Sequence, residues 1–440
     1  MTSGMSIAER LADFAAAAPR FDDTMERFVR FSLFDWATVG IAGRDEPVAR
    51  AVRKMALENA VLSSGATLFG GGSVTAAAAA LANGATSHAL DYDDTHFGHI
   101  GHPSVAVIPA AVSLAEIGRT DGQAFIHSVA IGLETACRVG AWLGRAHYDA
   151  GFHQTGTSGA FGATAAAGRI LGLDTDRMAE AFSLTATRAA GLKSQFGTMG
   201  KPLNAGFAAE VGVTCALLAQ AGAISTRSAI EGVQGFGPTH AAEANQAAFD
   251  GLGENWIFPS ISYKFHACCH GLHAMLEALR RLIAEGLPVD AVEQAEIRTN
   301  PRWLAVCDQP EPATGLQAKF SYRLTAAMML AGLDTAALDV YSDATCARED
   351  LCALRDRISV TGDPELTDSQ ARITVIANGR SYEAFHDILA DMDPDKVEQR
   401  LREKSATLLG AAPARELWQS VTELGPRKQL SGLIAKIASA

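Results

Sequence analysis

The stretch HALDYDDTHFGHIGHPS, residues 88–104, holds four of the chain's 12 histidines together with three aspartates. Three of these histidines recur at every third residue, which on a helix would place them on one face and suggest a metal site. Gly98, Gly101 and Pro103 interrupt such a helix, so the sequence predicts a loop. A metal site, a solvated turn and a proton-transfer site all remain open. Proton transfer is favoured, because histidine titrates near neutrality and an adjacent carboxylate can fix its tautomer.

Three further stretches carry ionisable side chains. AHYDAGFHQTGTSG places His153 before a helix of small residues, whose N-terminus favours an anion; a surface histidine is the alternative. SQFGTMGKPLNAG places Lys201 after two glycines that would let it approach a ligand, although a lone loop lysine is usually solvated.

The last of these stretches, YKFHACCHGLH (residues 263–273), combines Lys264 with three histidines and two adjacent cysteines. Adjacent cysteines do not match the CxxC spacing of a zinc site, and no second half-site is found in the sequence. We therefore expect a loop that leads into a helix, near a boundary where a cleft could form, and no metal.

The elements that must position these residues change in character along the chain. From residue 5 to about 255 the apolar spacing is helical, and stretches such as SGAFGATAAAGRILGL indicate closely packed, buried helices. After about residue 290, AVEQAEIRTN and LRDRISVTGD are typical of strands, and ARITVIANGRSYEAFH of a hairpin. The predicted fold is mainly α: an all-helical domain from residues 1–261 and 396–440, with an α+β domain, 262–395, inserted.

Composition excludes several classes of function. The chain has 440 residues, of which 48% are hydrophobic, enough for a large core. A net charge of −12 argues against nucleic-acid and membrane partners, but allows an anionic substrate where buried lysines set the local field. Seven scattered cysteines and an N-terminus without an apolar signal segment indicate free thiols and a cytoplasmic location. No run is apolar enough for a membrane span, and no nucleotide-binding motif is present.

Taken in order, these stretches and the later NPR and AKFSYRLTAAMML resemble the MmgE/PrpD family over roughly residues 6–430. The family includes 2-methylcitrate dehydratase, cis-aconitate decarboxylase and iminodisuccinate epimerase. The resemblance implies a helical domain built from both chain ends, an inserted α+β lid, a homodimer and a cofactor-free site in the cleft between the domains. Carried over motif by motif, the family's site residues fall on Asp91, Thr95, His102, His153, Lys201 and Lys264.

Two positions depart from the animal decarboxylase. Cys269 stands where that enzyme has a histidine, and Leu324 where it has a tyrosine. The resemblance therefore favours a hydro-lyase of the 2-methylcitrate dehydratase type acting on a small di- or tricarboxylic acid. A decarboxylase or epimerase on a similar acid, and a non-catalytic carboxylate-binding protein, are the alternatives.

The expected mechanism is proton removal from carbon next to a carboxylate. Lys201 and Lys264 would stabilise the developing charge. His102 and His153 would act as base and acid in an order that the sequence leaves open. The remaining expected site residues are Asp91, which would orient a histidine, and Thr95 and Cys269, which would contact the substrate.

Overall fold

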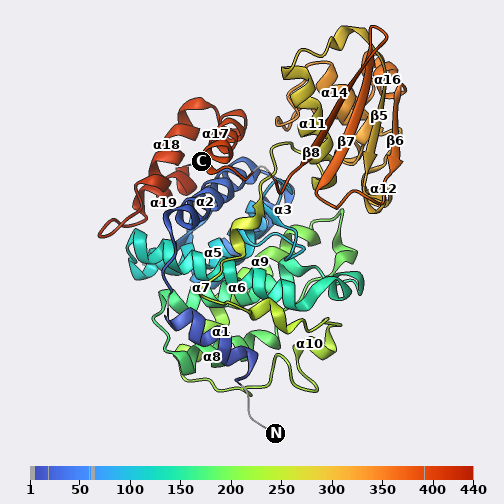
Figure 1. The fold of residues 1–440 in the computed structure, drawn as a ribbon. Helices are drawn as coiled ribbons and strands as arrows, with labels where there is room; N and C mark the ends of the chain where they lie inside the picture. Colours follow the sequence, from blue (N-terminus) through green and yellow to red (C-terminus); the bar gives the residue numbers. More distant parts are fainter. Residues whose placement is uncertain (1–4, 18, 59, 61–64, 391, 440) are drawn as a thin grey trace. The chain divides into compact units, whose positions relative to one another are not determined.

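The computed structural model describes residues 5–17, 19–58, 60, 65–390 and 392–439, which form two compact units (Figure 1). Unit 1 comprises Met1–Tyr263 and Leu409–Ala440, and unit 2 comprises Lys264–Leu408. The chain thus returns to unit 1 near residue 409, not at 396 as the sequence suggested, because helix α17 (Pro394–Leu409) packs within unit 2. The mainly helical fold class is confirmed; the lid role of unit 2 stays a prediction.

Unit 1 is helical, and the strands among its described residues are two-residue pairings. Strand β1 (Ala66–Thr67) pairs with β2 (Ser73–Val74), and β3 (Thr95–His96) with β4 (Ile261–Ser262), both antiparallel. Its helices are α1 (Ile7–Ala17), α2 (Asp23–Gly43), α3 (Pro47–Leu57), α4 (Ala76–Ser87), α5 (Ser104–Gly118), α6 (Gly122–Asp149), α7 (Gln154–Ile170), α8 (Thr175–Ala186), α9 (Gly200–Gln220), α10 (Phe236–Thr239), α18 (Ala411–Thr422) and α19 (Ser431–Ser439).

Small residues let the central helices of unit 1 approach closely. A Cβ atom on Gly206 of α9 would lie 2.4 Å from the carbonyl oxygen of Leu81 in α4. A Cβ atom on Gly162 of α7 would lie 2.5 Å from the carbonyl oxygen of Gly132 in α6. Every residue from 154 to 168 of α7 is buried, which confirms the prediction of buried, closely packed helices.

Helix α9 is the one described helix that is long and apolar enough to cross a membrane by length and composition. However, 67% of its most apolar window is buried inside the structure, as in the core helix of a globular protein. Burial against α4 and α7 accounts for its apolar composition.

Unit 2 contains a four-stranded sheet of order β6-β5-β7-β8. Strands β5 (Val292–Thr299) and β6 (Ile358–Gly362) are parallel, whereas β7 (Gln370–Ala377) is antiparallel to β5 and to β8 (Arg380–Asp387). The predicted hairpin is confirmed: Asn378 and Gly379, with φ of 50° and 65°, form its turn. Helix α11 (His273–Ala284) packs on β7 and β8 (Figure 1). The other helices of unit 2, besides α11 and α17, are α12 (Pro301–Cys307), α13 (Gly315–Ala318), α14 (Tyr322–Leu330), α15 (Asp343–Cys346) and α16 (Glu349–Arg355).

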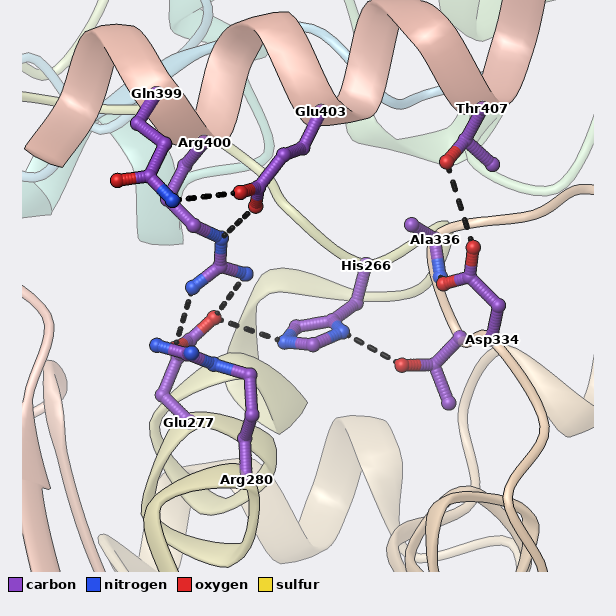
Figure 2. Close-up of polar contacts among 10 residues, drawn as sticks. His266, Glu277, Arg280, Asp334, Ala336, Gln399, Arg400, Glu403 and Thr407 are labelled. Carbon is purple, nitrogen blue, oxygen red and sulfur yellow. Dashed lines mark hydrogen bonds and ion pairs between the residues drawn. The ribbon is translucent and has the colours of Figure 1, made fainter. Parts of the chain in front are cut away.

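A buried carboxylate on α11 joins the segment after Lys264 to α17 (Figure 2). Glu277 accepts hydrogen bonds from both terminal nitrogens of Arg400, at 2.7 and 2.8 Å. It also contacts the Nε2 atom of His266 at 3.1 Å, while the Nδ1 atom of His266 lies 2.7 Å from the Thr335 hydroxyl. Because a buried charge must be paired, this network explains why α17 packs with unit 2.

Candidate active site

The turn after α4 brings a buried aspartate between two histidines. His88 caps the C-terminus of α4, and Asp91 takes a left-handed φ of 51°, which reverses the chain. The Oδ1 atom of Asp93 then lies 2.8 Å from Nδ1 of His88, and its Oδ2 atom 2.8 Å from Nδ1 of His102. The first contact is a hydrogen bond; the second has an ion-pair distance but not hydrogen-bond alignment. One carboxylate therefore lies against both imidazole rings and orients that of His88 by a hydrogen bond.

The charges of this group are set by burial and by mutual contacts. Burial alone would raise the pKa of Asp93, but His88 and His102 outweigh it and hold that pKa well below its usual range. Burial lowers the pKa of His102 to about 4, against the opposing effect of Asp93. Near neutral pH, Asp93 is thus a carboxylate and His102 a neutral imidazole. The Nε2 atom of His88 has no hydrogen-bond partner among the described residues.

A lysine joins this group through a second aspartate. The Nζ atom of Lys201 lies 2.6 Å from Oδ2 of Asp91, whose Oδ1 atom is 3.7 Å from Nε2 of His102. Lys201 lies in the first turn of α9, not in a loop, and its side chain is only 16% exposed. The interpretation of a solvated loop lysine is therefore wrong.

His153 lies beside the same group. It is the N-cap residue of α7, its ring centroid is 6.5 Å from that of His102, and it meets the Phe196 ring edge-on at 4.9 Å. Its Nδ1 atom lies 3.1 Å from Nδ2 of Asn204, which also donates to the Leu192 carbonyl oxygen. Burial, with the positive charge of Lys201, holds the pKa of His153 well below its usual range.

Three helices begin at this group. The N-cap residues of α5, α7 and α9 are Pro103, His153 and Met199, and none makes a side-chain capping hydrogen bond. By contrast, aspartates cap α2, α6 and α8. Uncapped helix N-termini present backbone N–H groups and partial positive charge, which favour a bound anion.

Two of the four clustered histidines lie elsewhere. The Nε2 atom of His96 is 2.9 Å from the Ile257 carbonyl oxygen, and Nδ1 of His99 is 3.0 Å from the Ser158 hydroxyl. The predicted loop is observed, and its histidines at 96, 99 and 102 do not converge as a metal face. A different set could hold a metal: the ligand atoms of His88, Asp91, Asp93 and His102 all lie within 4.8 Å of one another. In that set, Lys201 already pairs with Asp91.

Asp94 forms a separate buried network behind the site. Its Oδ2 atom accepts hydrogen bonds from the hydroxyls of Ser32 and Ser104, at 2.9 and 2.5 Å. Burial, reinforced by the nearby charge of Asp35, raises the pKa of Asp94 to about 8. Asp94 is therefore protonated near neutral pH.

The remaining expected residues belong to other segments of the chain. Thr95 belongs to β3, in register with Ser262 of β4. Lys264 is buried in unit 2, and Cys269 precedes the short turn that leads into α11 in the same unit. Their approach to the cluster in unit 1 stays a prediction.

The structure adds His88, Asp93 and Asn204, which the sequence analysis did not select as site residues. His88 and Asp93 lie in the histidine-rich stretch, so their i, i+5 spacing across a turn was visible in the sequence. Asn204 carried no such signal, because its contact with His153 spans 51 positions.

Comparison with known proteins identifies two family domains, the second of which runs past the end of unit 2 at Leu408. Residues 9–247 match the MmgE/PrpD N-terminal domain, and residues 266–422 match the MmgE/PrpD C-terminal domain. The cis-aconitate decarboxylase-like protein oryM of Aspergillus oryzae is 26% identical over 401 residues, 82% of each chain. Cis-aconitate decarboxylase of Aspergillus terreus is 33% identical over 220 residues, 47% of this chain and 45% of its own. The human cis-aconitate decarboxylase is 27% identical over 266 residues, 57% of this chain and 54% of its own. The chain therefore belongs to the MmgE/PrpD family.

Proposed function

We propose that this protein is a cofactor-independent lyase that transfers a proton at the carbon next to a carboxylate of a small di- or tricarboxylic acid. The observation that carries the proposal is the bridge by Asp93 between His88 and His102, beside Lys201. The bridge places a carboxylate against both imidazole rings, and burial keeps His102 neutral, as a catalytic base requires, while Lys201 supplies a cation for the substrate. Family membership and the decarboxylase relatives support a lyase-type, acid-processing enzyme.

The polar atoms nearest to each ring indicate which histidine is the base. A carboxylate only accepts, so Asp93 favours the tautomer of His102 with hydrogen on Nδ1 and a lone pair on Nε2. The amide nitrogen of Asn204 only donates, so it favours hydrogen on Nε2 of His153. We assign His102 as the base and His153 as the acid.

The low pKa of His102 belongs to the site without substrate. A polycarboxylate bound next to the ring would raise that pKa, because a nearby negative charge favours the imidazolium form. Proton removal by His102 would then place negative charge on the substrate carboxylate, next to Lys201 and the helix N-termini. A negative substrate would likewise favour the imidazolium form of His153. In a dehydration, this imidazolium would give its Nε2 proton to the leaving hydroxyl, so that water departs, an alkene remains and His153 returns to its neutral form.

A hydro-lyase of the 2-methylcitrate dehydratase type is our first choice. Cys269 and Leu324 replace the histidine and tyrosine expected of an animal-type decarboxylase, and Leu324 is fully buried on α14. The second candidate is a decarboxylase, favoured by the names of the relatives. There the C–C bond to a carboxylate breaks, carbon dioxide leaves, and the acid protonates the carbanion. In an epimerase, a proton would return to the same carbon from the opposite face, which inverts its configuration.

Several wider features belong to the same proposal. We propose a homodimer in the cytoplasm, with unit 2 acting as a lid that brings Lys264 and Cys269 to the substrate, which Thr95 of unit 1 would also contact. A protein that only binds carboxylates would not need oriented acid and base histidines, and this argues for catalysis.

The test is an NMR time course in D₂O with citrate, 2-methylcitrate, cis-aconitate and substituted succinates, each with and without a chelator. A new alkene at constant carbon count supports the dehydratase, and release of carbon dioxide supports the decarboxylase. Deuterium exchange without net conversion supports the epimerase. Activity lost on chelation and restored by zinc or iron would instead assign the four-residue group to a metal. Thermal stabilisation of the protein by these acids, without any reaction, would support the alternative of a non-catalytic carboxylate-binding protein.

A further inference from the structure

Two cysteines of unit 2 lie in direct contact at the turn before α11. The thiol of Cys307 donates to the sulfur of Cys269, with 3.2 Å between the two sulfur atoms. Cys307 ends α12 and is fully buried, whereas Cys269 is half-buried. We propose that this pair is a site of reversible oxidation, at which a hydroperoxide converts Cys269 and Cys307 into a disulfide.

Packing holds the two sulfur atoms together. A Cβ atom on Gly271, two residues after Cys269, would lie 2.6 Å from the Trp303 ring and 3.1 Å from the Cys307 sulfur. Trp303 is itself anchored, because its Nε1 atom donates to the Asp368 carbonyl oxygen at 2.9 Å. A disulfide requires a sulfur–sulfur distance of about 2.0 Å, so closure needs a shift of about 1 Å.

The surroundings assign different roles to the two thiols. The hydrogen bond to Cys269 and burial hold the pKa of Cys307 well above its usual range. Cys307 therefore stays protonated and stabilises a thiolate on Cys269. The positive charge of Lys264 reaches this cluster, since it lowers the pKa of both Cys268 and Cys307 against the larger effect of burial. Cations next to a half-buried thiol favour its reactive form.

The neighbouring Cys268 is excluded from the pair. Its thiol lies against the Tyr341 hydroxyl, and burial raises its pKa to about 12. Cys269 is thus the thiol that reacts first, and Cys307 the thiol that resolves the product.

The chemistry balances in two steps. The Cys269 thiolate attacks one oxygen of the hydroperoxide, the O–O bond breaks, and Cys269 becomes a sulfenic acid as an alcohol or water leaves. The Cys307 sulfur then attacks the Cys269 sulfur, and its proton leaves with the displaced hydroxide as water. The two thiols lose two electrons in total, and the peroxide gains them.

The test uses the full-length reduced protein, treated with hydrogen peroxide and then blocked with N-ethylmaleimide. Trypsin should release peptides 265–280 and 303–319 joined by a disulfide, which mass spectrometry detects and a reductant separates. Because the first peptide contains both adjacent cysteines, Cys268→Ser should keep the link and Cys269→Ser should abolish it. Cys307→Ser should also abolish it and leave a sulfenic acid on Cys269 that dimedone captures. Cys352→Ser, a half-buried cysteine elsewhere in unit 2, is the matched control and should keep the link.

The proposal is overturned if neither hydrogen peroxide nor diamide links the two peptides, or if the link persists in Cys269→Ser. Cys307→Ala, which keeps an apolar side chain, should repeat the result if serine disturbs the core. The measurement needs no substrate, so it succeeds or fails independently of the proposed function.

Discussion

At the scale of single residues, the site is a set of ionisable side chains in contact with one another, most of them buried. Asp93 is balanced by His88 and His102, and Asp91 by Lys201. Removing one member of a pair leaves the other member without its counterpart. A substitution should therefore change both the orientation of the remaining side chain and the charge of the site. Predictions at this scale concern single substitutions.

His102→Ala and Lys201→Ala should each lower kcat by about 10²-fold or more, as the loss of an acid–base or charge-stabilising group does. Steady-state kinetics on the substrate identified by NMR measure this. His127→Ala, a partly buried histidine against Phe21, is the control and should keep near-normal turnover. Normal kcat in both site variants would exclude the assignment.

Asp94→Asn should change how stability depends on pH. The pKa of Asp94 is raised to about 8 in the folded protein, from an ordinary aspartate value of 3.8. The unfolded chain therefore loses this proton first, and the stability that Asp94 contributes is lost as pH rises from about 4 to about 8. Asparagine cannot ionise, so the Tm of the variant relative to wild type should rise across this window.

Asp45→Asn, at an aspartate whose side chain is 70% exposed, should show no such trend. A Tm difference that is constant with pH in Asp94→Asn would mean that Asp94 ionises normally in the folded protein.

At the scale of elements, closely crossing helices hold the site together. Lys201 on α9 meets Asp91, which follows α4, because α4 and α9 cross at Gly84 and Gly206. Asn204 on α9 meets His153 at the start of α7. The site therefore depends on positions that carry no chemistry themselves.

Gly206→Ala should destabilise the protein by about 1–3 kcal/mol, because the new methyl group would lie against the Leu81 carbonyl oxygen. It should also lower kcat by separating Lys201 from Asp91. Denaturant unfolding and kinetics measure the two effects. Gly118→Ala is the control: its Cβ would meet only the Thr120 hydroxyl at 3.6 Å, and both quantities should stay near wild type. An unchanged free energy of unfolding in Gly206→Ala would contradict the role given to this crossing.

At the scale of the whole molecule, the chain forms two compact units that each bury ionisable side chains. Unit 1 contains the histidine cluster, and unit 2 contains the Glu277 network that includes α17 (Figure 2). We expect a defect in one of these networks to loosen its own unit first, since proteins open in contiguous cooperative segments.

Glu277→Ala leaves Arg400 and His266 without their shared carboxylate, and should cost about 3–5 kcal/mol in unit 2. Hydrogen exchange measured by mass spectrometry should show faster exchange in peptides from 264–408, with little change in peptides from α4 to α9. Glu285→Ala, which removes an exposed carboxylate from the end of α11, should change little. Equal loss of protection in both units would show that the molecule opens as one cooperative body.

Local patterns in the sequence were sufficient for much of the fold. Helical spacing and small residues predicted the buried helices, and Asn378–Gly379 predicted the hairpin, because these features depend on neighbours along the chain. The end of the inserted segment was placed too early at 396. The sequence of helix α17 does not show which unit the helix joins, because this depends on the contact of Arg400 with Glu277, 123 positions away.

The sequence by itself determined which residue types gather at the site and that their stretch is a loop rather than a helical metal face. Only the tertiary structure decided which histidines converge: His88 and His102 on Asp93, with His96 and His99 turned to other partners. It also placed Lys201 in a helix beside Asp91, where the spacing along the sequence had left a solvated loop lysine open as an alternative. The physical reason is that orientation, burial and charge pairing depend on contacts between distant segments, which spacing along the chain does not encode.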